Sequence, residues 1–165
     1  MTEKILQAKR FAIKAHGDQK YGNEFPYAIH LQAVESVLLR FDIVDENIRC
    51  AAWLHDTLED TNIQYEEIEL FFGKEVANIV SRLTEPKGGN RKWRHYETYP
   101  KIKELEEAVI LKLADRIANV EAGGDKVKMY IKEYAFFKES LFDDKQLEIT
   151  KKMWLHLNAL MIDKK

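Results

Sequence analysis

The chain has 165 residues, of which 45% are hydrophobic and 33% charged, a balance that is usual for one globular domain with a substantial core. The formal net charge of -2 argues against a broad basic surface for duplex nucleic acid. With a single cysteine and no recognisable secretory leader or membrane-spanning apolar stretch, we expect a cytoplasmic protein without a membrane partner.

Amphipathic helical patterns follow one another along the N-terminal half, separated by glycine and proline. The expected elements are a helix over about 5–16, a loop over 17–26, a helix with Pro26 in its first turn, a helix from an N-cap at Asp45 through His55, a short helix over 66–72 and a helix after Gly73.

The C-terminal half contains the longest irregular and most basic piece, residues 85–95, which we expect to be a loop or connector. Helices are expected over 106–120, 127–141 and 145–162. No segment alternates with a period of two, which would indicate strands. The prediction is therefore an all-α protein, with residues 1–165 forming one helical bundle.

One short segment, residues 51–61, places four ionisable side chains in an apolar helical stretch: His55, Asp56, Glu59 and Asp60. Burying an unpaired charge costs several kcal/mol, and a divalent cation stabilises such a cluster. In a continuous helix, the i,i+4 spacing stacks His55 on Glu59 and Asp56 on Asp60. The segment therefore predicts a metal site.

Two further stretches supply candidate ligands. His30 lies in an otherwise apolar helical pattern, and Asp115 lies in another, where Asn119 shares its face. Two imidazoles and two carboxylates form a mixed nitrogen and oxygen site, which favours Mn²⁺, Fe²⁺ or Zn²⁺ over a cysteine-type structural zinc site. Open positions in such a site suit hydrolysis.

The strings around these residues resemble the HD-domain metal-dependent phosphohydrolases, and within them the hydrolase domain of RelA/SpoT proteins and the small alarmone hydrolases. The most specific strings are the His-Asp-x-x-Glu-Asp run from His55 and the Lys-Leu-Ala-Asp-Arg run from Lys112. The resemblance spans about residues 8–122 and leaves 123–165 as C-terminal helices of the same domain. It also covers the strings Ala15–Gln19, Pro26–His30 and Phe72–Gly73 with Val76.

The resemblance implies roles for individual residues. The ligands of a single Mn²⁺ would be His30, His55, Asp56 and Asp115. The acidic pair Glu59 and Asp60 would orient or deprotonate the attacking water, and Asn119 would contact the nucleotide. The implied activity is (p)ppGpp 3′-pyrophosphohydrolase, which removes the 3′-diphosphate of guanosine tetra- or pentaphosphate.

Substrate phosphates require cations, and several basic residues lie near these strings. Lys20 precedes His30 in the predicted loop, and the basic segment contributes Arg91, Lys92 and Arg94. Lys112 lies one turn before Asp115 and could instead face outward. Tyr27 could stack on a base or belong to the core.

Alternatives stay open. The glycine of the usual His-x-Gly-Gln string is shifted in His16–Gln19, and Lys20-Tyr21 stands where a basic pair is frequent. The substrate could therefore be NADPH or another phosphorylated nucleotide. A non-catalytic nucleotide sensor and a structural helical adaptor are further alternatives. Neither explains why the chain carries the full set of candidate site residues: His30, His55, Asp56, Glu59, Asp60 and Asp115. Surplus aromatic residues on the last two helices are compatible with a homodimer.

Overall fold

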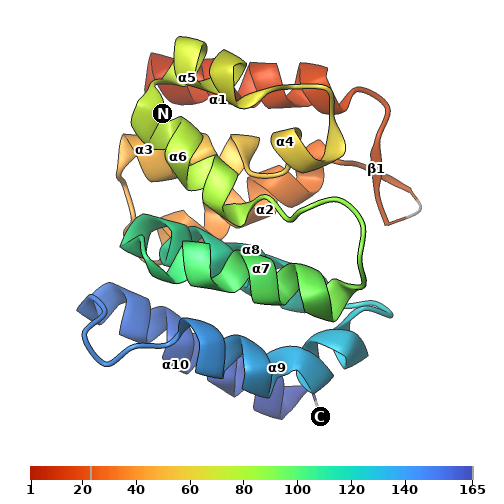
Figure 1. Ribbon diagram of the computed structural model, residues 1–165, viewed down its shortest axis with the longest axis vertical. Coiled ribbons are helices and arrows are strands. Elements are labelled where there is room, and N and C mark those ends of the chain that lie inside the picture. The colour runs from red at the N-terminus through yellow and green to blue at the C-terminus, as the bar shows by residue number, and fades with distance from the viewer. Residues whose placement is uncertain (23, 165) are drawn as a thin grey trace.

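The computed structural model describes residues 1–22 and 24–164, and within them it contains ten helices and one two-stranded antiparallel sheet (Figure 1). In chain order they are α1 (Glu3–His16), β1 (Lys20–Tyr21), β2 (Phe25–Pro26), α2 (Ala28–Arg40), α3 (Glu46–Leu54), α4 (Thr57–Asp60), α5 (Tyr65–Phe72), α6 (Lys74–Leu83), α7 (Arg91–Lys103), α8 (Glu106–Ala122), α9 (Val127–Leu141) and α10 (Glu148–Asp163). The predicted all-α class is confirmed.

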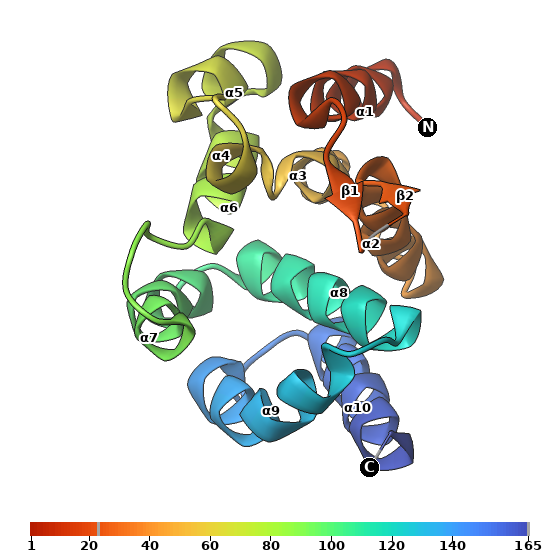
Figure 2. The ribbon, with the colours of Figure 1, turned by 90° about the vertical axis from the view of Figure 1, so that its right-hand side faces the viewer.

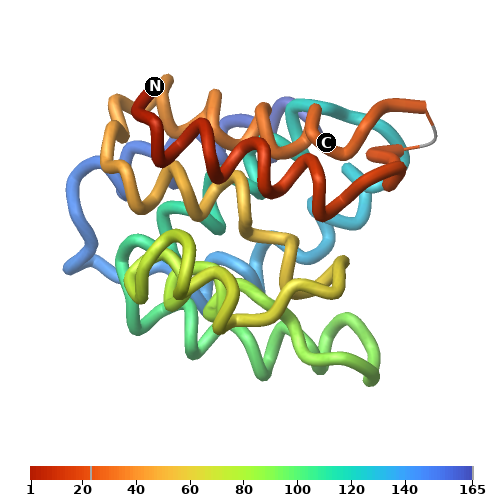
Figure 3. Tube along the Cα trace, turned by 90° about the horizontal axis from the view of Figure 1, so that it is seen from above, coloured from red at the N-terminus to blue at the C-terminus, as the bar shows by residue number. Residues whose placement is uncertain are grey.

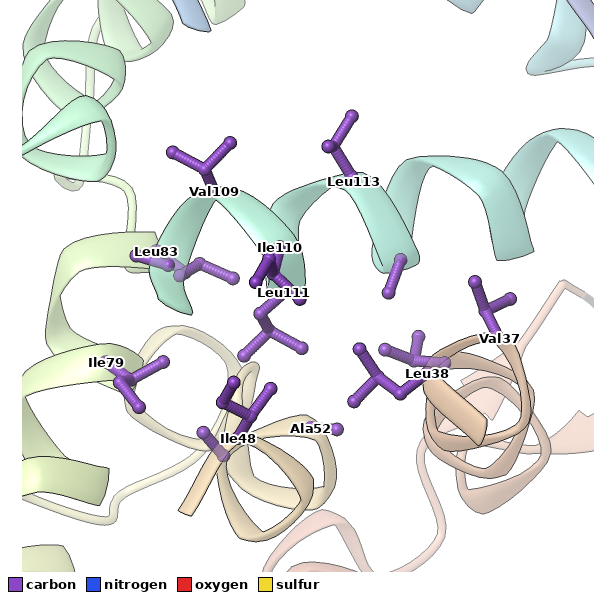
Figure 4. Packing of buried hydrophobic residues seen from close by; sticks show 14 of the residues in the cluster. Val37, Leu38, Ile48, Ala52, Ile79, Leu83, Val109, Ile110, Leu111 and Leu113 are labelled. Atoms are coloured by element: carbon purple, nitrogen blue, oxygen red, sulfur yellow. The ribbon is translucent and has the colours of Figure 1, made fainter. Parts of the chain in front are cut away.

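Helix α8 crosses the middle of the molecule. Figure 2 shows α2, α3 and α6 on one side of it and α9 and α10 on the other, and α8 contacts all of these helices. In Figure 4, Ile110 and Leu111 point toward α3, while Val109 and Leu113 point to the opposite side of α8. Because α8 is covered on both sides, the run Ala108–Leu111 is apolar at every position and fully or almost fully buried.

A buried ionic cluster joins α2 to α3. The carboxylate of Glu35 accepts hydrogen bonds from the Arg49 guanidinium at 2.6 and 3.2 Å and from Nε1 of Trp53 at 2.8 Å. Glu35 is 3% exposed, so its charge depends on these donors rather than on water. The cluster fixes the relative position of the two helices whose ends carry His30 and His55.

The expected loop over 17–26 contains a small hairpin, in which Lys20 pairs with Pro26 and Tyr21 with Phe25. Pro26 lies in β2, and α2 begins two residues later, at Ala28. The prediction that Pro26 lies in the first turn of the second helix is therefore wrong. Proline has no N–H to donate, but the end of a short edge strand accommodates it.

The helical spacing assumed between His55 and Asp60 is interrupted. Helix α3 ends at Leu54, and the short α4 starts at Thr57. Side chains satisfy the free backbone carbonyl groups at the end of α3 by hydrogen bonding. Thr57 Oγ1 donates to Leu54 O at 2.7 Å, and His55 Nδ1 lies 2.8 Å from Ala52 O. The expected i,i+4 stacking of His55 on Glu59 therefore does not apply.

The basic segment 85–95 is irregular only as far as Asn90. Asn90 caps α7 by accepting a hydrogen bond from Trp93 N at 2.9 Å, so Arg91, Lys92 and Arg94 lie in a helix. Pro100 inside α7 weakened the helical signal, but the buried residues Thr98, Tyr99 and Ile102 hold this turn against the core. Helix α10 starts at Glu148, three residues later than expected.

Three connections gather at one end of the molecule: the β1–β2 hairpin, the segment before α7 and the α8–α9 connection (Figure 3). Among the described residues, no helix is long and apolar enough to cross a membrane.

Candidate metal centre and active site

Four candidate ligands converge from three separate parts of the chain. His30 lies in the first turn of α2, His55 and Asp56 lie at the break between α3 and α4, and Asp115 lies in α8. Nε2 of His30 is 3.6 Å from Oδ2 of Asp56 and 3.4 Å from Oδ1 of Asp115. Nε2 of His55 is 2.9 Å and 3.9 Å from the same two oxygens.

This spacing fits a shared cation. Ligand atoms bound at about 2.1 Å and at right angles to one another stand about 3 Å apart. One atom from each of His30, His55 and Asp56 lies within 4.8 Å of the others. His55 and Asp56 are consecutive residues at the break between α3 and α4, and their side chains approach within 2.9 Å.

The hydrogen bonding of His55 supports the same interpretation. The Ala52 carbonyl, 2.8 Å from Nδ1, can only accept, so Nδ1 carries the proton. In the neutral ring, Nε2 then presents a lone pair toward the carboxylate of Asp56, 2.9 Å away. Two acceptors at this distance require a cation or a proton between them, and a divalent metal fits the two imidazoles and two carboxylates.

The titration behaviour reflects the same crowding. Burial lowers the pKa of His30, but the carboxylates of Asp115 and Asp56 together outweigh burial and raise it to about 9. Burial alone would raise the pKa of Asp115. The nearby Lys112, His30 and His55 outweigh burial and hold this pKa well below its usual range. The carboxylates are therefore ionised, as metal ligands must be.

Glu59 and Asp60, the predicted acidic pair, are held from different sides. Oε2 of Glu59 accepts a hydrogen bond from the backbone N–H of Glu85 at 3.1 Å, and Oδ2 of Asp60 accepts one from Gln19 at 2.8 Å. Desolvation by the cavity walls raises the pKa of Glu59 to about 6, and the charge of Asp56 adds to this rise. Glu59 therefore has a pKa suited to accepting a proton near neutral pH.

A cavity of about 340 Å³ opens over these residues. Its lining includes the four candidate ligands, both acidic residues, and the basic residues Lys20, Arg91, Arg94, Lys112, Arg116 and Lys126. Five carboxylates and six cations line it, so a divalent ion would make the cavity clearly positive. Such a cavity suits an anionic substrate.

The predicted phosphate-binding residues occupy different positions. Lys20 is exposed and lines the cavity, as do Arg91 and Arg94. Arg91 forms a two-point ion pair with Glu133 at 2.7 and 3.2 Å, and Arg94 donates to Glu85 at 2.8 Å. Lys92 is not among the described lining residues. It is exposed, and its ammonium lies 5.8 Å over the ring of Tyr96.

Tyr27 and Asn119 both touch the candidate ligands. The Tyr27 hydroxyl donates to Oδ2 of Asp56 at 2.6 Å, and its ring stacks on His16 at 4.5 Å. Nδ2 of Asn119 donates to Oδ1 of Asp115 at 2.6 Å. Both residues line the cavity, so contact with a substrate and support of a ligand are compatible there.

The predicted site did not include several other residues that line the cavity, among them Gln19, Tyr21, Glu85, Arg116 and Lys126. The guanidinium of Arg116 lies between the rings of Tyr130 and Phe137, at 4.6 and 4.3 Å. Its Nη1 is buried and lies 3.8 Å from Oε2 of Glu133, within ion-pair distance but too far for a hydrogen bond. The only available signal was the position of Arg116 directly after Asp115 in a recognised string.

The molecule is similar to proteins of known family. A family model described as an HD domain matches residues 8–135. A guanosine-3′,5′-bis(diphosphate) 3′-pyrophosphohydrolase of Aquifex aeolicus is 40% identical over 124 residues, which are 73% of this chain but only 18% of that relative. The pyrophosphohydrolase MESH1 of Xenopus tropicalis is 39% identical over 122 residues, covering 70% of this chain and 67% of that relative.

A solved structure agrees with the fold. It was described as a metazoan ortholog of SpoT that hydrolyses ppGpp, and it aligns with a TM-score of 0.82 over 99% of this chain and 97% of that one, at 23% identity. At this identity the likeness concerns the fold. Together with the family model and the two relatives, it leads to one conclusion: the chain belongs to the HD domain family.

Proposed function

We propose that this protein is a metal-dependent (p)ppGpp 3′-pyrophosphohydrolase. The observation that carries the proposal is that His30 and His55 place Nε2 atoms 2.9 to 3.9 Å from carboxylate oxygens of Asp56 and Asp115, in a cavity that six cationic side chains also line. The pyrophosphohydrolase activity in the names of its relatives supports the choice of reaction. The implied metal is Mn²⁺, with Fe²⁺ or Zn²⁺ as alternatives.

A divalent cation in this site supplies Lewis acidity toward a phosphoryl group and makes water easier to deprotonate. Glu59 is the candidate to accept the proton of the attacking water, because its pKa is raised to about 6 and it lines the same cavity. Asp60, held by Gln19, would support the water from the other side.

Phosphoryl transfer depends mainly on positioning and charge stabilisation. Lys20, Arg91 and Arg94 are the proposed phosphate-binding residues, and the geometry adds Arg116, which lines the same cavity. Lys112 donates to Oδ2 of Asp115 at 3.2 Å, so it faces the cavity and not the solvent. Lys92, on the surface, is a weaker candidate.

The test is turnover of ppGpp by Mn²⁺-loaded protein, with NADPH in a parallel reaction. We expect pyrophosphate from ppGpp. Release of phosphate from NADPH, without any turnover of ppGpp, would identify NADPH as the substrate and leave the proposed metal-dependent hydrolysis unchanged. Nucleotide binding without any turnover would instead support the sensor alternative. Replacing Mn²⁺ by Fe²⁺ or Zn²⁺ in the same assay tests the metal.

We also propose that residues 1–165 act as one domain in the cytoplasm. The HD model matches only to residue 135, but α10 packs on α8, which carries Asp115.

A homodimer remains a further proposal, supported by exposed Leu155 and Ile162 on α10. Light scattering of the purified protein measures its oligomeric state directly.

A further inference from the structure

Tyr21 of strand β1 touches two of the proposed metal ligands from outside the ligand set. Its ring stacks on the imidazole of His30, with centroids 4.9 Å apart and planes 15° from parallel. Its hydroxyl lies 3.0 Å from Oδ1 of Asn119, whose Nδ2 is 2.6 Å from Oδ1 of Asp115. Tyr21 is therefore in contact with one ligand and one residue away from another.

The direction of these hydrogen bonds follows from their chemistry. The ionised carboxylate of Asp115 can only accept, so the amide nitrogen of Asn119 must face it. The amide oxygen of Asn119 then faces the other way and accepts from the Tyr21 hydroxyl. Nδ2 of Asn119 also donates to the backbone O of Asp115 at 3.0 Å, so removing the hydroxyl takes away one of three bonds that orient the amide and weakens its hold on the Asp115 carboxylate.

The imidazole ring of His30 depends on neighbouring aromatic rings to fix its plane, whereas that of His55 does not. A metal-binding histidine usually donates its second ring N–H to a carbonyl or carboxylate, which fixes the plane of the ring. His55 has this bond, to Ala52 O at 2.8 Å. Nδ1 of His30 is buried and has no hydrogen-bond partner among the described residues, so the stacked ring of Tyr21 and the edge-on ring of Tyr27 hold it instead.

We infer that Tyr21 is a positioning residue of the metal centre: its ring orients His30, and its hydroxyl orients Asp115 through Asn119. The inference rests on the proposed function, because it takes His30 and Asp115 as ligands. Tyr21 is itself held in place, since it pairs with Phe25 and Gln19 O accepts from Tyr27 N at 3.1 Å.

The test is the affinity of metal-stripped protein for Mn²⁺, measured by isothermal titration calorimetry. Tyr21→Phe keeps the ring and removes the hydroxyl, and we expect it to weaken Mn²⁺ binding by about 10-fold, as for other residues that support metal ligands. Tyr21→Ala removes both contacts and should weaken binding further. Tyr65→Phe is the matched control, because it removes a comparable tyrosine–asparagine hydrogen bond of 2.8 Å outside the cavity.

Activity provides a second, independent readout. If Tyr21 acts through the ligands, added Mn²⁺ should restore the kcat of Tyr21→Phe, with an unchanged KM for the nucleotide. Wild-type Mn²⁺ affinity in Tyr21→Phe would overturn the role of the hydroxyl, and a raised KM at saturating Mn²⁺ would make Tyr21 a substrate-binding residue. If the wild-type protein binds no Mn²⁺, the proposed function fails and the inference fails with it.

Discussion

At the scale of single residues, the candidate site separates groups of one chemical type by their surroundings. The carboxyl of Asp115 lies among cations and stays ionised, whereas the carboxyl of Glu59 is partly desolvated near the negative Asp56 and has a raised pKa. Two carboxylates within one cavity are thereby suited to different tasks, one to holding a cation and one to accepting a proton.

Glu59→Gln tests the second task. The amide cannot accept a proton from water, so we expect kcat to fall by at least ~10²-fold while Mn²⁺ affinity is retained. Glu66→Gln, an exposed glutamate on α5, is the control. A nearly normal rate would assign the proton transfer to another group, with Asp60 the first candidate.

The same assignment predicts the pH dependence. Glu59 acts as a base only when ionised, so the wild-type rate should fall as the pH drops through the pKa of its carboxyl. That pKa is about 6 in the metal-free protein, and a nearby cation lowers it, so the acidic limb should lie at pH 6 or below. A profile of kcat/KM against pH measures this limb, which should be absent in Glu59→Gln.

At the scale of elements, the junction between α2 and α3 depends on the buried carboxylate of Glu35. Replacing it by alanine leaves the guanidinium of Arg49 buried without its partner. We expect Glu35→Ala to lower the free energy of unfolding by about 3–5 kcal/mol, measured by urea denaturation. Glu139→Ala, at an exposed position of α9, should change it by less than about 0.5 kcal/mol, and an equally small loss in Glu35→Ala would contradict the prediction.

Elements with a strong local signal could be predicted from the sequence. Helix α6 has its predicted residues Val76, Ile79, Val80 and Leu83 buried, and Asp45 caps α3 as expected, by accepting from Ile48 N at 2.9 Å. Helix α7 could not be predicted, since Pro100 and its polar residues hide a helix that tertiary packing stabilises. The two-residue strands are too short to show any periodicity.

The residues of the candidate site also divide into those that the sequence predicts and those that only the folded structure reveals. Recognisable strings singled out His30, His55, Asp56 and Asp115, and the structure brings these four together. The positions of Glu85 and Arg116 depend instead on contacts made only in the folded chain, with Glu59 and with the rings of α9. The break after Leu54 also depends on side chain to backbone bonds that helical periodicity does not encode.

At the scale of the whole molecule, the candidate ligands come from α2, the α3–α4 junction and α8, so a bound cation would link these parts. A ligand at 100 times its Kd adds about 2.7 kcal/mol to the stability of the folded state. For a protein of this size we expect the Tm to rise by about 5–10 °C when Mn²⁺ is added to chelator-treated protein. Differential scanning calorimetry measures the change.

Asp56→Ala should lose this rise in Tm, whereas Asp144→Ala, at an exposed position after α9, should retain it. An equal rise in Tm for both variants would mean that the stabilising ion binds elsewhere.

The double-sided burial of α8 has a consequence for how much of the chain the catalytic chemistry requires. No described residue of α10 lines the cavity, yet Val109 and Leu113 lie on the face of α8 directed away from α3 and are fully buried (Figure 4). A chain cut before α9 would expose this face to water and loosen the helix that carries Asp115. Helix α10 thus supports Asp115 from a distance, because it covers the far side of α8 without lining the cavity.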